Sequence, residues 1–206
     1  RWAKGRLMAG IGPSVYELAG GAPPVLPTAK FTHLNSAWVW TDIAEGTNAI
    51  YASGYAGSQS DIYKFVLDTS GNVPVLASGG VLAAQLPRGE VVYSMTTYLG
   101  SFVGIGTSRG FRVGEIDDQG DLRYGPLLIE NASGVKAVAA FDRFFFVAAT
   151  NAIEAKSGLY RVDLGQPVQD SGGTPSVRYA YATDLQAKVT GAVNSVTNFG
   201  NSDRMA

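Results

Sequence analysis

The 206-residue chain contains no cysteine. Disulfides, thiolate nucleophiles and thiolate metal sites are therefore excluded, and redox chemistry says nothing about the compartment. Histidine is nearly absent too, because His33 is the single one. A two-histidine metal site is excluded, and a Ser-His-Asp triad stays only formally possible. Since no G-x-S-x-G nucleophile elbow accompanies His33, we interpret it as a histidine at a strand turn or edge.

Charge is also scarce. Charged residues make up 16% of the chain, and the formal net charge is −1 with no block of like charges. Soluble domains usually carry about 25% charged residues. This pattern indicates neither a nucleic acid nor an anionic membrane surface as a partner.

Long apolar runs are missing as well. The longest, Phe144 to Ala149, is far shorter than the ~20 residues of a membrane-spanning helix. We therefore expect a soluble protein without membrane insertion. The chain opens at Arg1-Trp2 with neither an initiator methionine nor a leader segment, which favours a piece of a longer protein.

What the chain does contain is a repeat. An aromatic residue begins a similar alternating string at Tyr16, Tyr63, Phe111 and Tyr160, at spacings of 47, 48 and 49 residues. Self-similarity at such a period indicates stacked supersecondary units that bury their apolar faces against one another.

The third unit shows what one repeat contains. Segments rich in β-branched and aromatic residues, separated by Gly, Ser and Asp turn signals, predict four strands. They are Glu90–Tyr98, Phe102–Thr107, Phe111–Ile116 and Leu122–Glu130. We denote the four strands of a unit A to D.

The other units fill the same positions. Strand A is predicted at Lys30–Thr41, Val135–Phe141 and around Lys188–Thr197, and strand B at Leu7–Ile11, Ile50–Tyr55 and Phe145–Thr150. Strand D is predicted at Pro24–Thr28, Val73–Ser78 and Val177–Thr183. A longer Gly- and Pro-containing segment, Gln166 to Thr174, precedes the last of these and predicts a protruding loop.

Four-stranded antiparallel units of about 48 residues predict an all-β fold, a β-propeller or an open arc of one. A parallel β-helix would need a shorter repeat, and a sandwich would not keep this spacing. The approximate units are 1–29, 30–79, 80–131 and 132–186, with a further unit starting at 187–206.

The end of the chain repeats its beginning. Trp2, Met8 and Ala9 match Phe199, Met205 and Ala206, each at an offset of 197 residues. A closed ring of four blades would not contain the beginning of a fifth unit. This match favours an arc of a larger propeller, since four to eight blades are typical.

Asp117, Asp118 and Asp121 fall within one turn, where three carboxylates could gather Ca²⁺. The spacing is not that of an EF-hand loop. The corresponding turn at Asp68 has no second carboxylate, so we favour a hairpin in which Asp caps the local backbone.

No other set of residues predicts catalysis. A glycosidase pair needs two carboxylates converging on the central channel, and no sialidase-type Asp-box is present. Gly104-Ile105-Gly106 opens no helix that could cradle phosphate, and the strand-A aromatics Trp38, Trp40 and Tyr98 are predicted to pack between blades. The isolated acidic residues in or beside turns are Asp42, Glu45, Asp61, Glu115 and Glu154. We thus predict no catalytic, cofactor-binding or metal-binding residue and no cofactor.

The strings Lys4 to Gly10 with Val15 to Leu18, and Ser157 to Asp163, are similar to blades in the propeller regions of minor tail proteins from phages of actinobacteria. This resemblance implies a non-enzymatic structural or recognition module of the virion, at the tail tip or baseplate. Its implied partners are other tail proteins and host cell-surface glycans, and it also allows a homo-oligomer in the tail. The alternatives are the propeller of a polysaccharide-acting bacterial enzyme and a bacterial protein-interaction scaffold.

Overall fold

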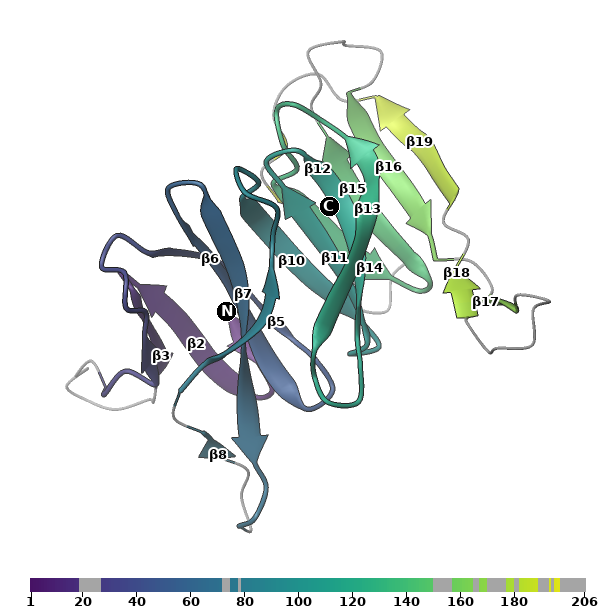
Figure 1. Ribbon diagram of the computed structural model, residues 1–206. Coiled ribbons are helices and arrows are strands. Elements are labelled where there is room, and N and C mark those ends of the chain that lie inside the picture. Colours follow the sequence, from purple (N-terminus) through teal and green to yellow (C-terminus); the bar gives the residue numbers. More distant parts are fainter. Residues whose placement is uncertain are drawn as a thin grey trace.

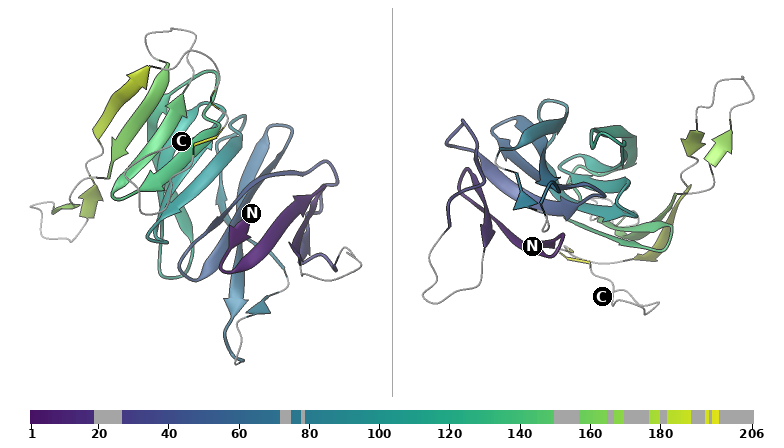
Figure 2. Two further views of the ribbon diagram at one scale, coloured as in Figure 1. Left: turned by 180° about the vertical axis from the view of Figure 1, so that it is seen from behind. Right: turned by 90° about the horizontal axis from the view of Figure 1, so that it is seen from below.

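Strands make up all the regular structure that the computed structural model describes (Figure 1). The described residues are 1–18, 27–71, 75–77, 79–149, 157–164, 167–169, 177–179, 182–188, 193, 195 and 196. Four antiparallel sheets, which we call blades 1 to 4, follow one another in chain order (Figures 1 and 2).

Blade 3 matches the predicted unit. Its strands are β10 (Val92–Tyr98), β11 (Phe102–Thr107), β12 (Gly110–Ile116) and β13 (Leu122–Glu130), paired in that order. The predicted four-stranded antiparallel blade is confirmed.

The other blades repeat this order with the first strand innermost. Blade 1 consists of β1 (Trp2–Ala3), β2 (Arg6–Ile11), β3 (Ser14–Leu18) and β4 (Phe31–Thr32). Blade 2 consists of β5 (Val39–Glu45), β6 (Ala49–Ala56), β7 (Gln59–Asp68) and β9 (Val81–Gln85), with the short β8 (Val75–Leu76) pairing the end of β7. Blade 4 consists of β14 (Ala137–Phe141), β15 (Phe144–Ala149), β16 (Gly158–Asp163) and β19 (Ala182–Lys188).

The predicted first strand of blade 2, Lys30–Thr41, is wrong. Phe31 and Thr32 instead pair with β3 as the outer strand of blade 1, where the Ser14 and Thr32 hydroxyls lie 2.8 Å apart. A turn follows, in which the Asn35 side chain accepts the Ala37 N–H at 2.9 Å. The inner strand of blade 2 therefore runs later, from Val39 to Glu45.

The outer strands of the blades also differ from their predicted positions. Of the segment Pro24–Thr28, the described residues 27 and 28 are not strand. Of the segment Val73–Ser78, the described residues 75–77 include the short β8, and Val81–Gln85 forms the outer strand of blade 2. Lys188, predicted to begin a new strand A, is the last residue of β19, and most of that predicted strand lies outside the described residues, as do Phe199 and its neighbours.

The predicted protruding segment contains part of a hairpin. Strand β17 (Pro167–Gln169) pairs with β18 (Val177–Tyr179), inserted between β16 and β19 of blade 4. Figure 2 shows this hairpin pointing away from the blades. The outer strand predicted at Val177–Thr183 is therefore wrong at its start and is replaced by β19.

Adjacent blades bury apolar side chains between them, as a repeat array requires. Phe65 and Ile50 lie between blades 1 and 2, Ile62 and Ile105 between blades 2 and 3, and Phe111 and Phe145 between blades 3 and 4. Trp38 is almost fully buried, and Tyr98 packs against the core between blades 3 and 4. The predicted packing between blades is confirmed for Trp40 and Tyr98. Trp38 instead stacks on His33 just before β5, and Trp2, at the matching position of the first unit, is 70% exposed.

An ion pair is buried between the start of blade 3 and its third strand. The carboxylate of Glu90, which is 0% exposed, accepts hydrogen bonds from Arg112 Nε at 2.8 Å and Arg112 Nη2 at 2.9 Å. Thr107 donates a third at 2.7 Å. Burial alone would raise the pKa of Glu90, but these hydrogen bonds and the Arg112 charge hold that pKa below its ordinary value.

The turn between β12 and β13 contacts blade 2. Asp117 Oδ1 accepts the backbone N–H groups of Gln119 and Asp121 at 3.0 and 2.9 Å, while Asp121 Oδ1 accepts a hydrogen bond from Lys64 Nζ at 2.6 Å. The Tyr51 hydroxyl donates to the Gly120 carbonyl at 2.8 Å. The predicted capping role of Asp is confirmed in this turn, and again at Asp68, which accepts the Ser70 N–H at 2.9 Å.

Ionisation of Tyr51 is expected to lower the stability of the fold at alkaline pH. Burial, together with the charges of Asp117 and Asp121, raises the pKa of Tyr51 from 10 to about 12. Because the folded pKa is the higher one, this group's contribution is complete below pH 10 and is lost as the pH rises through 12. We expect the free energy of unfolding to fall by roughly 2–3 kcal/mol across that window.

Urea titrations of the wild type and Tyr51→Phe at several pH values measure this loss. The variant should be less stable at neutral pH by about 1 kcal/mol, because it lacks the hydrogen bond to Gly120. The difference between the two proteins should vanish or reverse above pH 11. Parallel stability curves over the whole range would contradict the role given to Tyr51.

Candidate functional site at the start of the inner strands

The inner strands of blades 2, 3 and 4 lie side by side, with β10 between β5 and β14. Where these strands begin, a cavity of about 230 Å³ opens between them. Its polar lining comes from several blades because each inner strand starts at the same end of the array. The side chains that matter below are those of Arg1, Thr41, Asp42, Tyr93, Ser94 and Lys136, with Ser195 and Val196 on one side.

Two of the inner strands carry a β-bulge at this cavity. The pairing register of β5 with β6 shifts between Trp40 and Asp42, and that of β10 with β11 shifts between Val92 and Ser94. Thr41 and Tyr93 are the extra residues. Bulges redirect side chains and are over-represented beside functional sites, so two in equivalent positions mark this end of the strands.

Asp42 joins blade 2 to blade 3 at the cavity. Its Oδ2 accepts the backbone N–H of Met95 at 2.8 Å, and its Oδ1 accepts that of Ile43 at 2.8 Å. Arg1 Nη1 lies 3.5 Å from Oδ1. Burial raises the pKa of Asp42, although the hydrogen bonds and the Arg1 charge oppose that rise.

Ser94 and Lys136 are two residues of the lining whose polar side-chain atoms have no hydrogen-bond partner among the described residues, although the Ser94 Oγ is closed off from solvent. Ser94 is 8% exposed, and its buried Oγ has no hydrogen-bond partner among the described residues. Buried hydroxyls are nearly always hydrogen-bonded. Lys136 Nζ lies 5.9 Å from the centre of the Tyr93 ring and, within the described part of the chain, faces no carboxylate at ion-pair distance.

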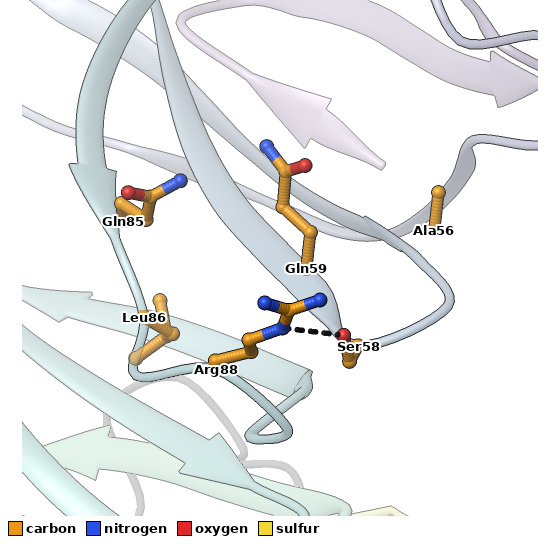
Figure 3. A pocket seen from close by; sticks show the side chains of 6 residues that line it. All are labelled: Ala56, Ser58, Gln59, Gln85, Leu86 and Arg88. Atoms are coloured by element: carbon orange, nitrogen blue, oxygen red, sulfur yellow. Dashed lines mark hydrogen bonds between the residues drawn. The ribbon is translucent and has the colours of Figure 1, made fainter.

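A second cavity, of about 500 Å³, lies at the edge of blade 2 (Figure 3). It is framed by the turn between β6 and β7 and by the segment after β9. Arg88 Nε donates to Ser58 Oγ at 3.3 Å, and the Gln59 and Gln85 side chains flank the same opening. The Gln59 side chain also donates a hydrogen bond to the buried Asp61 carboxylate at 2.7 Å.

The acidic residues were predicted to lie in or beside turns, and for Asp42 this is wrong. Asp42 sits within inner strand β5 and lines the cavity, one residue beyond the end of the strand predicted at Lys30–Thr41. Asp61 and Glu115 do lie near the ends of β7 and β12, and Glu45 ends β5. Glu154 lies outside the described residues.

His33 follows β4 and stacks on Trp38, with ring centres 3.9 Å apart. Its Nδ1 accepts the Asn35 N–H at 3.1 Å, so the proton lies on Nε2, which is 3.0 Å from the Tyr63 hydroxyl. The histidine thus belongs to an aromatic cluster between blades 1 and 2. Among the residues described, no three His, Asp or Glu side chains gather as a metal site, and no helix there is long and apolar enough to cross a membrane.

The cavity residues other than Asp42 were not singled out in the sequence. No local motif joins these residues. Tyr93 and Ser94 lie at the bulge of β10, and Lys136 follows more than 40 residues later in the chain. The cavity residues can be found by aligning the first residues of the inner strands. Thr41-Asp42 then matches Tyr93-Ser94 and Lys136-Ala137, but this alignment requires the strand registers.

Stacked four-stranded blades with their inner strands converging define a β-propeller, and this chain forms an arc of one. Its fold is similar to that of a candidate 6-phosphogluconolactonase from Bacteroides uniformis, with a TM-score of 0.60 and 12% sequence identity. The match covers 96% of this chain and 61% of the other chain, so the arc spans less than two thirds of its structural relative. No family model and no curated protein sequence matches the chain.

Proposed function

We propose that this chain is the propeller region of a phage minor tail protein, a non-enzymatic module for tail assembly or host attachment. The observation that carries the proposal is the similarity of its B and C strands to such blades. Those strings, Lys4–Gly10, Val15–Leu18 and Ser157–Asp163, fall on β2, β3 and β16. Their partners would be other tail proteins and host-surface glycan.

Rigid packing supports this role. Each described blade shares a buried core with its neighbour, and Asp42, Lys64 and Tyr51 add polar links between blades. A module that transmits contacts between tail proteins and a host surface needs such a fixed arrangement. The hairpin β17–β18 projects from the array and is the natural candidate for a contact with a partner.

Mass spectrometry of purified particles tests the proposal. Peptides of this chain should be found in virions banded on a density gradient, at a constant ratio to the other tail proteins. A capsid protein serves as the positive control, and a non-structural phage protein as the negative one. Recovery of the peptides only from the infected-cell lysate would reject the proposal.

The second candidate is a polysaccharide-acting bacterial enzyme, favoured by one observation, the position of Asp42 in a polar cavity of a lactonase-like fold. In that case Asp42→Asn should abolish release of reducing sugar from a bacterial polysaccharide panel. If neither the wild type nor Asp42→Asn releases reducing sugar from any polysaccharide of the panel, this candidate is rejected.

A further inference from the structure

Blade 1 has one side that faces away from blade 2, and this side is built like those that pack between blades. The blades can be aligned on the hairpin that joins their second and third strands. Four residues before the end of the second strand, blades 2, 3 and 4 carry residues that are at most 1% exposed and pack against the preceding blade. These are Ala52, Val103 and Phe145. Blade 1 has the half-buried Leu7 at this position.

The neighbours of Leu7 extend this side into an apolar surface. Leu7 pairs directly with Trp2 on β1 and with Leu18 on β3, so the three side chains share one side of the sheet. Ala3 and Met8 alternate with them and pack in the core between blades 1 and 2. Trp2 is 70% exposed. An exposed tryptophan on an apolar surface is typical of a protein contact.

Blade 4, at the other end of the array (Figures 1 and 2), presents the opposite kind of side. Five residues before the end of the second strand, blades 2 and 3 carry Tyr51 and Phe102, which pack in the core shared with the following blade. Blade 4 has the half-buried Phe144 at this position. Phe146 lies on the same side, with its ring centre 6.3 Å from that of Phe144, while Phe145 between them packs against blade 3. Blade 4 therefore ends in an aromatic side of the type that a following blade covers.

We propose that two copies of this chain join head to tail. The side of blade 1 with Trp2, Leu7 and Leu18 packs against the side of blade 4 with Phe144 and Phe146 of the second copy. This contact continues the packing within the chain, where a side that faces the following blade always meets one that faces the preceding blade. The inference does not depend on the proposed function in the virion.

The two sides differ, so the contact is heterologous and either closes into a ring or continues as a filament. Each copy contributes four blades, and two copies together contribute eight. Closed propellers typically have four to eight blades. The expected product is therefore a ring of two copies, with the same contact made twice.

Size-exclusion chromatography with light scattering tests this assembly on the full chain. At about 100 μM, the wild type should have twice the mass of one chain. Trp2→Glu and Phe146→Glu should each raise the dissociation constant at least tenfold and shift the mass toward that of one chain, because each places a charge in the apolar contact. Leu99→Glu is the matched control, since Leu99 is 75% exposed in the turn between β10 and β11. Its mass should stay that of the wild type.

Mixing the two variants distinguishes a head-to-tail contact from a contact between like sides. The Trp2→Glu chain keeps its blade 4 side and the Phe146→Glu chain keeps its blade 1 side, so an equimolar mixture should form a heterodimer through one intact contact. A contact between two blade 1 sides would leave the Phe146→Glu dimer intact and give no heterodimer.

Three results would overturn the proposal. They are a wild-type mass other than that of two copies at about 100 μM, a dimer that Trp2→Glu or Phe146→Glu leaves intact, and a mixture that stays monomeric. Dilution of the wild type provides a test that needs no variant, should one of them misfold. It should shift the amide resonances of Leu7 and Leu18 and leave that of Leu99 in place, whereas dilution shifts confined to other blades would refute the contact.

Discussion

Replacing Arg112 with methionine is expected to lower the free energy of unfolding by about 3–5 kcal/mol. Methionine keeps much of the aliphatic volume but leaves the fully buried Glu90 carboxylate without its two Arg112 hydrogen bonds. The Gly125 carbonyl also loses its donor, Arg112 Nη1, at 2.8 Å. An uncompensated buried charge costs far more than the pair itself contributes.

Urea denaturation followed by tryptophan fluorescence measures this loss. The control is Arg123→Met in the same blade, because the Arg123 side chain is 86% exposed and lies 3.9 Å from Asp117. It should change stability by no more than about 0.5 kcal/mol. Adding Glu90→Gln to Arg112→Met should restore part of the loss, since it removes the stranded charge. Equal effects of Arg112→Met and Arg123→Met would refute the argument.

The Glu90–Arg112 ion pair is also expected to make the stability of the fold fall at acid pH. Since the folded pKa of Glu90 lies below its unfolded value of 4.5, the stability it contributes is present above pH 4.5. That contribution is lost as the pH falls through the folded pKa. The acid-dependent loss should therefore be smaller in Glu90→Gln than in the wild type.

Gly110→Ala is expected to cost about 3–5 kcal/mol. Gly110 begins β12 with φ +143°, a backbone conformation that residues with a side chain rarely adopt. A Cβ there would overlap the carbonyl oxygen of Ile129 on the paired strand β13. The chain must either move β12 away from β13 or disturb Phe111, which is fully buried between blades 3 and 4.

Gly57→Ala separates the cost of the backbone conformation from the cost of the steric overlap. Gly57 has φ +59° in the turn between β6 and β7, and nothing lies within 4 Å of a Cβ built there. This variant should lose only the backbone part, about 1–2 kcal/mol. The two variants are compared by thermal and urea unfolding, and a Gly110→Ala loss no greater than that of Gly57→Ala would show that the strands accommodate the methyl group.

Strand composition predicted most of blade 3 because its segments are bounded by strong turn signals. The strands Phe102–Thr107 and Leu122–Glu130 were predicted to the residue. Composition does not say which neighbour a strand pairs with, and this is where prediction failed. Phe31 and Thr32 read equally well as the start of the next blade or the end of the previous one.

The candidate site depended on that same distinction. A prediction that places the inner strand at Lys30–Thr41 leaves Asp42 outside it, so the position of Asp42 beside Ser94 does not follow from the sequence. Bulges at Thr41 and Tyr93 decide which side chains face the cavity. A bulge follows from the pairing of two whole strands, so no short stretch of sequence contains it.

The hairpin β17–β18 begins and ends at neighbouring positions of blade 4. Asp163 at the end of β16 pairs directly with Ala182 at the start of β19, although residues 164–181 separate them in the chain. Closing this loop depends only weakly on its length, at roughly 0.6 kcal/mol for each doubling. Related chains can therefore exchange or extend this segment while the blade stays intact, which makes it a place where diversity can arise by recombination and where a foreign peptide can be inserted.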